Sequence, residues 1–274
     1  MGTSLTIRPN DGEMLKPAEL IELRGVGPLT LHDRRVFNSL IEAAWGPDMA
    51  VPGREFTVPT ASLKHADEPM SRLAESIERL MQTIVVARAL DGTEMRFQLL
   101  GANTIRTTTN AGTLTYSFWP QLAALVRDSS IFAKLDHAVM RSFSSKYAFA
   151  LYEAVARRAR LRHVFRENFT IEGIRDLLGV EAGKLVPYKN LKTKAIEPAV
   201  VEVNALTPYQ VALEPRMDGR KVVGFIMGWG VKDETGMRDV YAEIQRPRVG
   251  RKERLNKAAE AHVILTNRCP IETL

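Results

Sequence analysis

The first half of the chain shows helical spacing of its hydrophobic residues, interrupted by short stretches of strand character. From Leu31 the apolar positions recur with a helical period, which places them on one face of a helix that Gly46-Pro47 ends. A short β segment, Phe56–Val58, follows, and Thr60 or Ser62 is placed to cap a short helix. The spacing then predicts a longer helix from about Pro69 to Gln82. The apolar faces of the two longer helices consist of Val36, Phe37, Leu40, Ile41, Ala44, Leu73, Ile77, Leu80 and Met81.

Three strand candidates follow these helices. They are Ile84–Leu90, Met95–Leu100 and Thr113–Trp119, with Asp91-Gly92 as a turn between the first two. The segment before the third strand is rich in Thr, Asn and Gly, and we expect it to be a loop. The order of helix, short strand, two helices and β-hairpin predicts a winged helix-turn-helix.

The second half repeats this order. Its predicted elements are a helix over Ser144–Arg160, a short strand Phe169–Ile171, a short helix Ile174–Leu178, a helical stretch Tyr188–Asn204 in which Pro198 marks a break or a new first turn, and a hairpin of Tyr209–Arg216 and Lys221–Val231. The repeated order is better support for duplication than any short sequence match. We therefore predict an α+β fold of two tandem winged helix-turn-helix domains related by pseudo-two-fold repetition.

The predicted boundaries divide the chain into four parts. Residues 1–28, punctuated by Gly and Pro, are expected to form an N-terminal arm, and residues 29–130 the first winged-helix domain. The second domain is expected at 131–234, entered through a helical connection over Ile131–Arg141. Residues 235–274 have few apolar stripes and many charges, so we expect a basic C-terminal tail that is loosely ordered or depends on a partner.

Net charge differs more between these parts than overall composition does. The 274 residues carry 38 Lys+Arg and 32 Asp+Glu, a net charge of +6. The segment 141–200 alone holds twelve basic and six acidic residues, an excess equal to that of the whole chain. Focused positive charge favours binding to a phosphate backbone. The alternative, for the cluster Arg157–Arg162, is a solvated helix face.

Residue patterns of known catalytic sites are missing from the sequence. A Walker A loop, a complete G-x-G-x-x-G and a G-x-S-x-G are absent, and the five histidines are scattered. Tyr147 and Tyr152 have helical spacing beside apolar residues, so we expect packing roles rather than DNA cleavage. The single Cys269 makes an intramolecular disulfide impossible, and no apolar run reaches the length of a membrane span. We expect a cytoplasmic protein without catalysis, metal, cofactor or membrane contact.

The most promising functional residues lie at the start of the helical stretch Tyr188–Asn204, the predicted recognition helix. Leu191, Ala195, Ile196, Ala199, Val200 and Val203 form its apolar side. The polar side combines amide, hydroxyl and ammonium groups that can pair with base edges and phosphates in the major groove. The candidate DNA contacts are Lys189, Asn190, Lys192, Thr193 and Lys194 on this helix, with Arg216, Arg220 and Lys221 on the wing. The alternative is an amphipathic helix with an ordinary polar face.

The equivalent helix of the first domain is more acidic. Its candidate backbone contacts are Arg72 and Arg79, with Arg106 on the following loop. Asp67, Glu68, Glu75 and Glu78 share the helix region, and carboxylates facing phosphates are repelled. We expect this domain to contact DNA more weakly, or to serve as a dimerisation surface.

The second half resembles the second winged helix of iteron-binding plasmid replication initiators. The resemblance rests on Ser145-Lys146-Tyr147-Ala148, Leu151-Tyr152-Glu153, Phe169-Thr170-Ile171, Ile174-Arg175, Leu177-Leu178-Gly179, Tyr188, Leu191-Lys192, Pro198-Ala199-Val200, Glu202-Val203-Asn204 and Gly219-Arg220-Lys221. It extends to the first half only through the order of elements. Leu191 stands where the family usually has an aromatic residue, and Val203 where it has isoleucine.

The resemblance implies a mechanism. Monomers would bind direct repeats in double-stranded origin DNA, open adjacent A·T-rich DNA and recruit the host helicase and host initiator proteins. Homodimers joined through the first domain would bind an operator inverted repeat and repress the initiator's own gene. The alternative is a winged-helix transcriptional repressor with no replication role.

Overall fold

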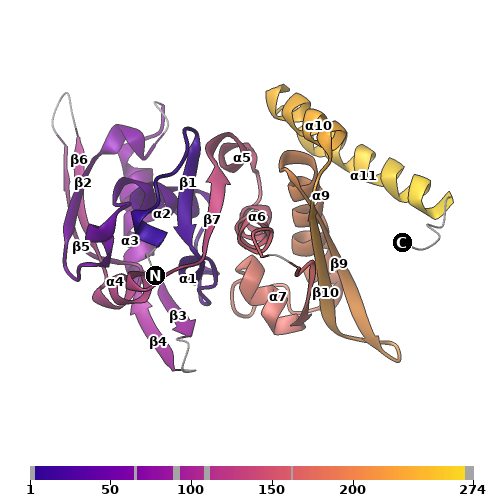
Figure 1. Ribbon diagram of the computed structural model, residues 1–274, viewed down its shortest axis with the longest axis horizontal. Helices are drawn as coiled ribbons and strands as arrows, with labels where there is room; N and C mark the ends of the chain where they lie inside the picture. Colours follow the sequence, from indigo (N-terminus) through magenta and orange to yellow (C-terminus); the bar gives the residue numbers. More distant parts are fainter. Residues whose placement is uncertain (1–3, 65–66, 89–92, 108–111, 162, 269–274) are drawn as a thin grey trace.

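The computed structural model describes residues 4–64, 67–88, 93–107, 112–161 and 163–268, with side chains described up to residue 259. Two mixed helix-and-sheet halves lie on either side of helix α6 (Lys146–Arg158), which Figure 1 shows end-on near the middle of the molecule. A single hydrophobic core runs through both halves and includes Leu151 and Val155 of α6. The two winged helices are therefore packed against each other through a shared helix.

The first winged helix consists of α2 (Leu31–Ala43), a single 3-10 turn Thr60–Ser62, α3 (Met70–Gln82) and a three-stranded sheet. Thr30 and Asp33 form a reciprocal capping box that begins α2. The predicted apolar faces of α2 and α3 are buried, apart from the half-buried Met81. The sheet has the strand order β2 (Glu55–Pro59), β6 (Thr113–Phe118), β5 (Leu100–Arg106), all antiparallel.

One strand of this sheet was not predicted. The Thr-, Asn- and Gly-rich segment expected to be a loop contains β5, which pairs with β6 and forms the true wing of this domain. The two preceding strands, β3 (Ile84–Arg88) and β4 (Glu94–Gln98), form a separate two-stranded sheet. Gly101 and Asn103 have low strand propensity, and the β5–β6 register shifts between Leu100 and Asn103, which places Gly101 at an irregularity of the ladder. The predicted turn Asp91-Gly92 lies outside the described residues.

The second winged helix repeats the first. Its elements are α6, β8 (Arg166–Thr170), α7 (Ile171–Leu178), the recognition helix made of α8 (Tyr188–Leu191), a π turn Lys192–Ile196 and α9 (Glu197–Leu206), and the wing strands β9 (Tyr209–Asp218) and β10 (Lys221–Val231). The strand order β8-β10-β9 matches β2-β6-β5 position for position: short strand, second wing strand, first wing strand. The predicted tandem fold is confirmed.

The prediction of an N-terminal arm over residues 1–28 is wrong for residues 13–21, which form a strand and a helix. Strand β1 (Glu13–Pro17) pairs with β7 (Phe132–Asp136), and α1 (Ala18–Ile21) follows directly. The connection over Ile131–Arg141, predicted to be helical, is therefore β7 followed by α5 (His137–Ser142). Five-residue strands are too short to reveal a period in the sequence, and their partner lies more than a hundred residues away.

The predicted tail is also more ordered than expected. It forms α10 (Glu234–Gln245) and α11 (Arg251–Arg268), which pack on α9, and Figure 1 shows α11 extending outward from the second half. In its described part the buried apolar side chains are Val240 and Leu255, and the half-buried Ile244 also packs on the core. Buried Glu243 of α10 accepts from Arg251 at 3.3 Å and Arg254 at 2.7 Å and so ties α11 to α10, while Arg251 also donates to the Ser142 carbonyl of α5 at 3.2 Å. An ion cluster gives no hydrophobic stripe, so the periodicity of the sequence did not show it. One further helix, α4 (Pro120–Arg127), covers the first half.

A buried polar cluster joins α6 to the first half. The Lys16 ammonium on β1 donates to Glu153 of α6 at 2.8 Å and to the side-chain oxygen of Asn38 on α2 at 2.9 Å. Asn38 also donates to Glu153 at 2.7 Å. Burial lowers the pKa of Lys16, and the Glu153 carboxylate partly opposes that shift. Each member of the cluster is satisfied only while α6 stays docked.

We expect Lys16→Met to lower the free energy of unfolding by about 3–5 kcal/mol, because it leaves the Glu153 carboxylate buried without its cation. Lys16→Met combined with Glu153→Leu should recover most of that loss. Lys134→Met is the matched control, since Lys134 on β7 pairs with Glu13 at the surface, 3.6 Å away, and should cost about 1 kcal/mol or less. Urea unfolding of the four proteins measures these differences. A double variant no more stable than Lys16→Met would contradict the assigned role.

Candidate nucleic-acid interface

The recognition helix presents one apolar and one polar side. Five of the residues expected on its apolar side are buried, and Val200 is half-buried: Leu191, Ala195, Ile196, Ala199 and Val203 form the buried set. Lys189, Lys192, Thr193 and Lys194 are exposed, and Asn190 is half-buried. Lys192 lies 3.4 Å from the Glu197 carboxylate, whereas Lys189 and Lys194 make no ion pair in the described part of the chain. The candidate contacts are thus grouped on one accessible stretch of helix.

Contacts at both ends hold this helix in place. At its start the Tyr188 ring packs on Phe225 of β10, with centroids 6.2 Å apart. Near its end the Asn204 side chain accepts from the Val211 amide at 2.7 Å and donates to the Val211 carbonyl at 2.9 Å. The Glu202 carboxylate accepts from the Ser144 amide at 3.0 Å at the start of α6. Tyr188, Glu202 and Asn204 belonged to the family pattern in the sequence, but their anchoring role required the structure.

The wing extends well beyond the body of the second half (Figure 1). Gly219 at its tip adopts a φ of 57°, a conformation that side-chain-bearing residues rarely take, and thereby closes the turn. All residues from Glu214 to Lys221 are exposed, including Arg216, Arg220 and Lys221. Arg216 pairs in register with Gly224, next to the Phe225 that Tyr188 contacts. The base of the wing therefore adjoins the start of the recognition helix through Tyr188 and Phe225, and the exposed cations Arg216, Arg220 and Lys221 lie further along the wing.

The candidate residues of the first half are not brought together in this way. Arg79 is held by the buried Asp33 carboxylate, with distances of 2.8 and 3.0 Å, and hydrogen bonds from Arg79 and Ser76 help lower the Asp33 pKa. Arg72 pairs with Glu68 at 2.9 Å. Arg106 is exposed at the end of the wing strand β5, whereas the other two lie on α3. Arg79 thus has a structural partner, and its contact with DNA stays a prediction.

Three arginines of the cluster Arg157–Arg162 make contacts within the chain, and Arg162 lies outside the described residues. Arg158 is buried and bonds to Glu167 at 2.8 Å and to Glu22 at 3.2 Å. Arg157 lies 2.8 Å from the same Glu22, and Arg160 stacks over the Phe132 ring at 4.2 Å. These cations attach α6 to α1, β7 and β8. Part of the focused charge therefore stabilises the fold.

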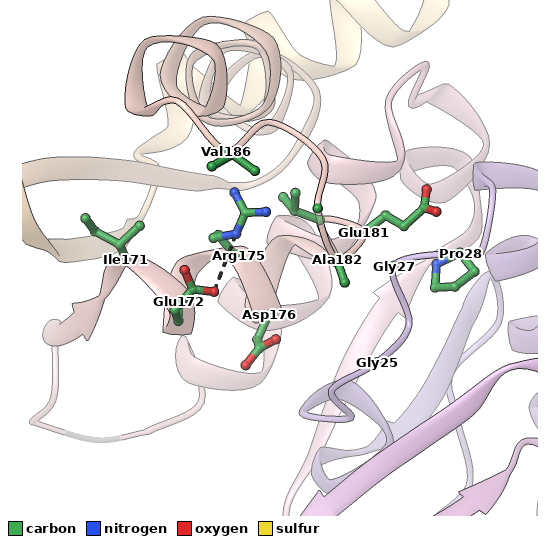
Figure 2. Close-up of a pocket in the computed structure, with 13 residues that line it drawn as sticks. Gly25, Gly27, Pro28, Ile171, Glu172, Arg175, Asp176, Glu181, Ala182 and Val186 are labelled. Atoms are coloured by element: carbon green, nitrogen blue, oxygen red, sulfur yellow. Dashed lines mark ion pairs between the residues drawn. The ribbon is translucent and has the colours of Figure 1, made fainter.

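A cleft of about 610 Å³ lies between the loop Gly25–Pro28 and α7 with its following loop (Figure 2). Its side chains include the carboxylates of Glu172, Asp176 and Glu181. The one arginine in the cleft, Arg175, is already held by Glu172 at 3.5 Å and by the Lys184 and Leu185 carbonyls. Burial raises the pKa of Asp176. A lining with this excess of carboxylates is unsuited to a nucleotide or another phosphate ligand.

Within the described residues, no three His, Cys, Asp or Glu side chains are grouped closely enough to hold a metal ion. None of the described helices is both long and apolar enough to span a bilayer.

Both halves match known family models. The model described as "Initiator Replication protein, WH1" matches residues 13–156, and "Initiator Rep protein, WH2" matches residues 170–229. The first match alone covers more than half of the chain. The chain belongs to the initiator replication protein family. Strand β1 and α1 lie inside the family's first winged helix, which agrees with their packing, whereas α10 and α11 lie beyond its second.

Structural comparison supports the same fold. The crystal structure of the Pi initiator protein in complex with iteron DNA aligns with a TM-score of 0.56 and 18% sequence identity, over 83% of this chain and 100% of that chain. A search of curated protein sequences gives no significant match. The predicted resemblance to replication initiators is confirmed at the level of family and architecture.

Proposed function

We propose that this family member initiates plasmid DNA replication by binding directly repeated sites, the iterons, in double-stranded origin DNA in the cytoplasm. The observation that carries the proposal is the accessible row from Lys189 to Lys194 beside an extended basic wing. Asn pairs bidentately with adenine, and Lys with guanine or phosphate, in the major groove. The Pi initiator protein, whose solved structure contains iteron DNA, shares the fold and supports this assignment.

In this proposal the two halves divide the work. The second winged helix contacts bases through Asn190, Thr193 and Lys194, and phosphates through the wing and the flanking lysines. The first contacts the backbone through Arg72, Arg79 and Arg106 and supplies the homodimer surface. Exposed Glu75 and Glu78 on α3 disfavour a close approach of that helix to phosphates, which supports the unequal roles. The dimer represses the initiator's own gene at an inverted repeat.

The proposal assigns the chain no catalytic step. Opening of A·T-rich DNA is driven by binding, and the host helicase and host initiator proteins are recruited as partners. A relaxase or primase would require a metal-dependent activity, so nicking or primer synthesis by the pure protein would contradict this assignment.

The second candidate function is transcriptional repression without a replication role, since two winged helices and a dimer serve it equally well. Direct repeats beside the gene favour the initiator, and a lone palindrome favours the repressor. A plasmid that carries only this gene and its flanking DNA should be maintained in a suitable host when no other origin is present. Failure in a host shown to support related plasmids, with intact binding upstream of the gene, would favour the repressor.

Asn190→Ala and Lys194→Ala should each weaken binding to the cognate site by about 1–3 kcal/mol, because each removes a base-edge contact. Arg127→Ala on α4 removes an exposed cation from the other half of the molecule and is the matched control. Mobility-shift titration at fixed salt gives the three affinities. Full affinity in both helix variants would contradict the assignment of the recognition helix.

Variants of the wing should behave differently from variants of the helix amide. Arg216→Ala, Arg220→Ala and Lys221→Ala should each weaken binding to specific and random duplexes alike. Each should also reduce the slope of log K against log salt by about 1, because one phosphate contact is lost. Asn190→Ala should leave that slope unchanged. Titrations at several salt concentrations measure it, and unchanged slopes in all three wing variants would show that the wing does not contact the backbone.

A further inference from the structure

Pro198 lies inside the recognition helix rather than at its end. The backbone dihedrals of Leu191, Lys192, Ile196 and Glu197 are all right-handed helical, so the helix continues through this region. A proline has no amide hydrogen and cannot donate to the Lys194 carbonyl, as an α-helix would require, and its ring crowds that carbonyl. The structure accommodates Pro198 with the π turn Lys192–Ile196, in which the Glu197 amide donates to the Lys192 carbonyl.

The π turn changes where the preceding side chains face. It takes one more residue than an α-helical turn, and each residue of an α-helix advances by about 100°. Consider an uninterrupted α-helix superposed on the segment after the turn. Compared with that helix, every residue before the turn is rotated by about 100° about the helix axis. The C-terminal half is held by Asn204 and Glu202, as described above. The start of the helix is held as well, by Tyr188 on Phe225 and by the buried Leu191, so the π turn allows both halves to keep their anchors. The facing of Lys189–Lys194, which carries all the proposed helix contacts, depends on this turn.

Pro198 stands in the first turn of α9, where proline is tolerated, but the π turn before it is helical as well, so no proline is needed to begin a helix here. Pro is the least favourable residue in a helix interior, and the neighbouring Glu197 and Ala199 are good helix formers. A residue that opposes local structure without a compensating packing gain marks a functional constraint more often than a structural one. Pro198 is only half-buried, whereas the buried side of this helix is formed by Leu191, Ala195 and Ala199.

We propose that Pro198 is a positioning residue for DNA recognition. Its π turn sets the rotation of Lys189–Lys194 about the helix axis and thereby determines which bases Asn190, Thr193 and Lys194 face. The proposal rests on the function assigned above, in which this helix enters the major groove. Pro198 itself contacts no base; it acts through the segment that precedes it.

The test is Pro198→Ala in the full chain, compared with wild type in selection from a random duplex pool and in thermal unfolding. Wild type should select a defined motif. Pro198→Ala should unfold at a higher temperature, yet bind the wild-type motif about tenfold more weakly and select an altered or degenerate one. Pro208→Ala is the control, because Pro208 follows the helix and accepts from the Lys232 amide through a carbonyl that alanine retains. It should select the wild-type motif.

The outcomes separate this inference from the proposed function. Selection of the same motif with the same affinity by Pro198→Ala would overturn the positioning role and leave the function intact. A lower unfolding temperature together with loss of all DNA binding would show that Pro198 is merely structural, which also overturns it. Selection of no motif by the wild type would overturn the proposed function, and the inference with it.

Discussion

The burial of α6 between the two halves is the constraint on which the other features depend. Its apolar side chains enter the cores of both winged helices, and its buried Glu153 requires Lys16 and Asn38 from the first half. The same helix supports the second half, because α9 packs along it and Glu202 caps its start. The recognition helix is thus oriented by its packing on α6, and the first half holds α6 in place. The Glu153 carboxylate favours a single docked position of α6, because a shifted α6 would leave Glu153 and Lys16 buried without each other.

This arrangement explains how the basic excess of residues 141–200 is used. Arg157 and Arg158 bind carboxylates of α1 and β8, and Lys146 donates to the Gly27 carbonyl at 2.6 Å across the junction of the halves. Gly27 itself must be a glycine, because a Cβ there would lie 2.5 Å from the Glu181 Cα. Exposed cations remain near the start of the recognition helix and on the wing. Arg141, Arg160, Arg166 and Lys184 are also exposed in the described part of the segment. Total charge indicated a polyanionic partner, but the internal pairing shows which cations are available to bind it.

Much of the architecture could be predicted from sequence because winged helices carry strong local signals. Helical stripes such as Val36–Ala44, the repeated element order and the Asp218-Gly219 turn predicted most elements near their observed positions. The errors fell where structure depends on distant partners or on charge: β1 with β7, β5 on β6, and the Glu243 cluster that holds α10 and α11. The exposed surface of the recognition helix was predicted, whereas its π turn and its anchors at Tyr188 and Asn204 were not, since hydrogen bonds between elements leave no periodic trace.

The central claim is that the start of the recognition helix contacts bases while the wing follows the backbone. A crystal structure of the full chain bound to the repeats that flank its gene tests it most directly. The account predicts that Asn190 and Lys194 lie within hydrogen-bonding distance of base edges in the major groove, with Arg216, Arg220 and Lys221 on phosphates. A complex in which this helix faces solvent, with DNA held by another surface, would contradict it.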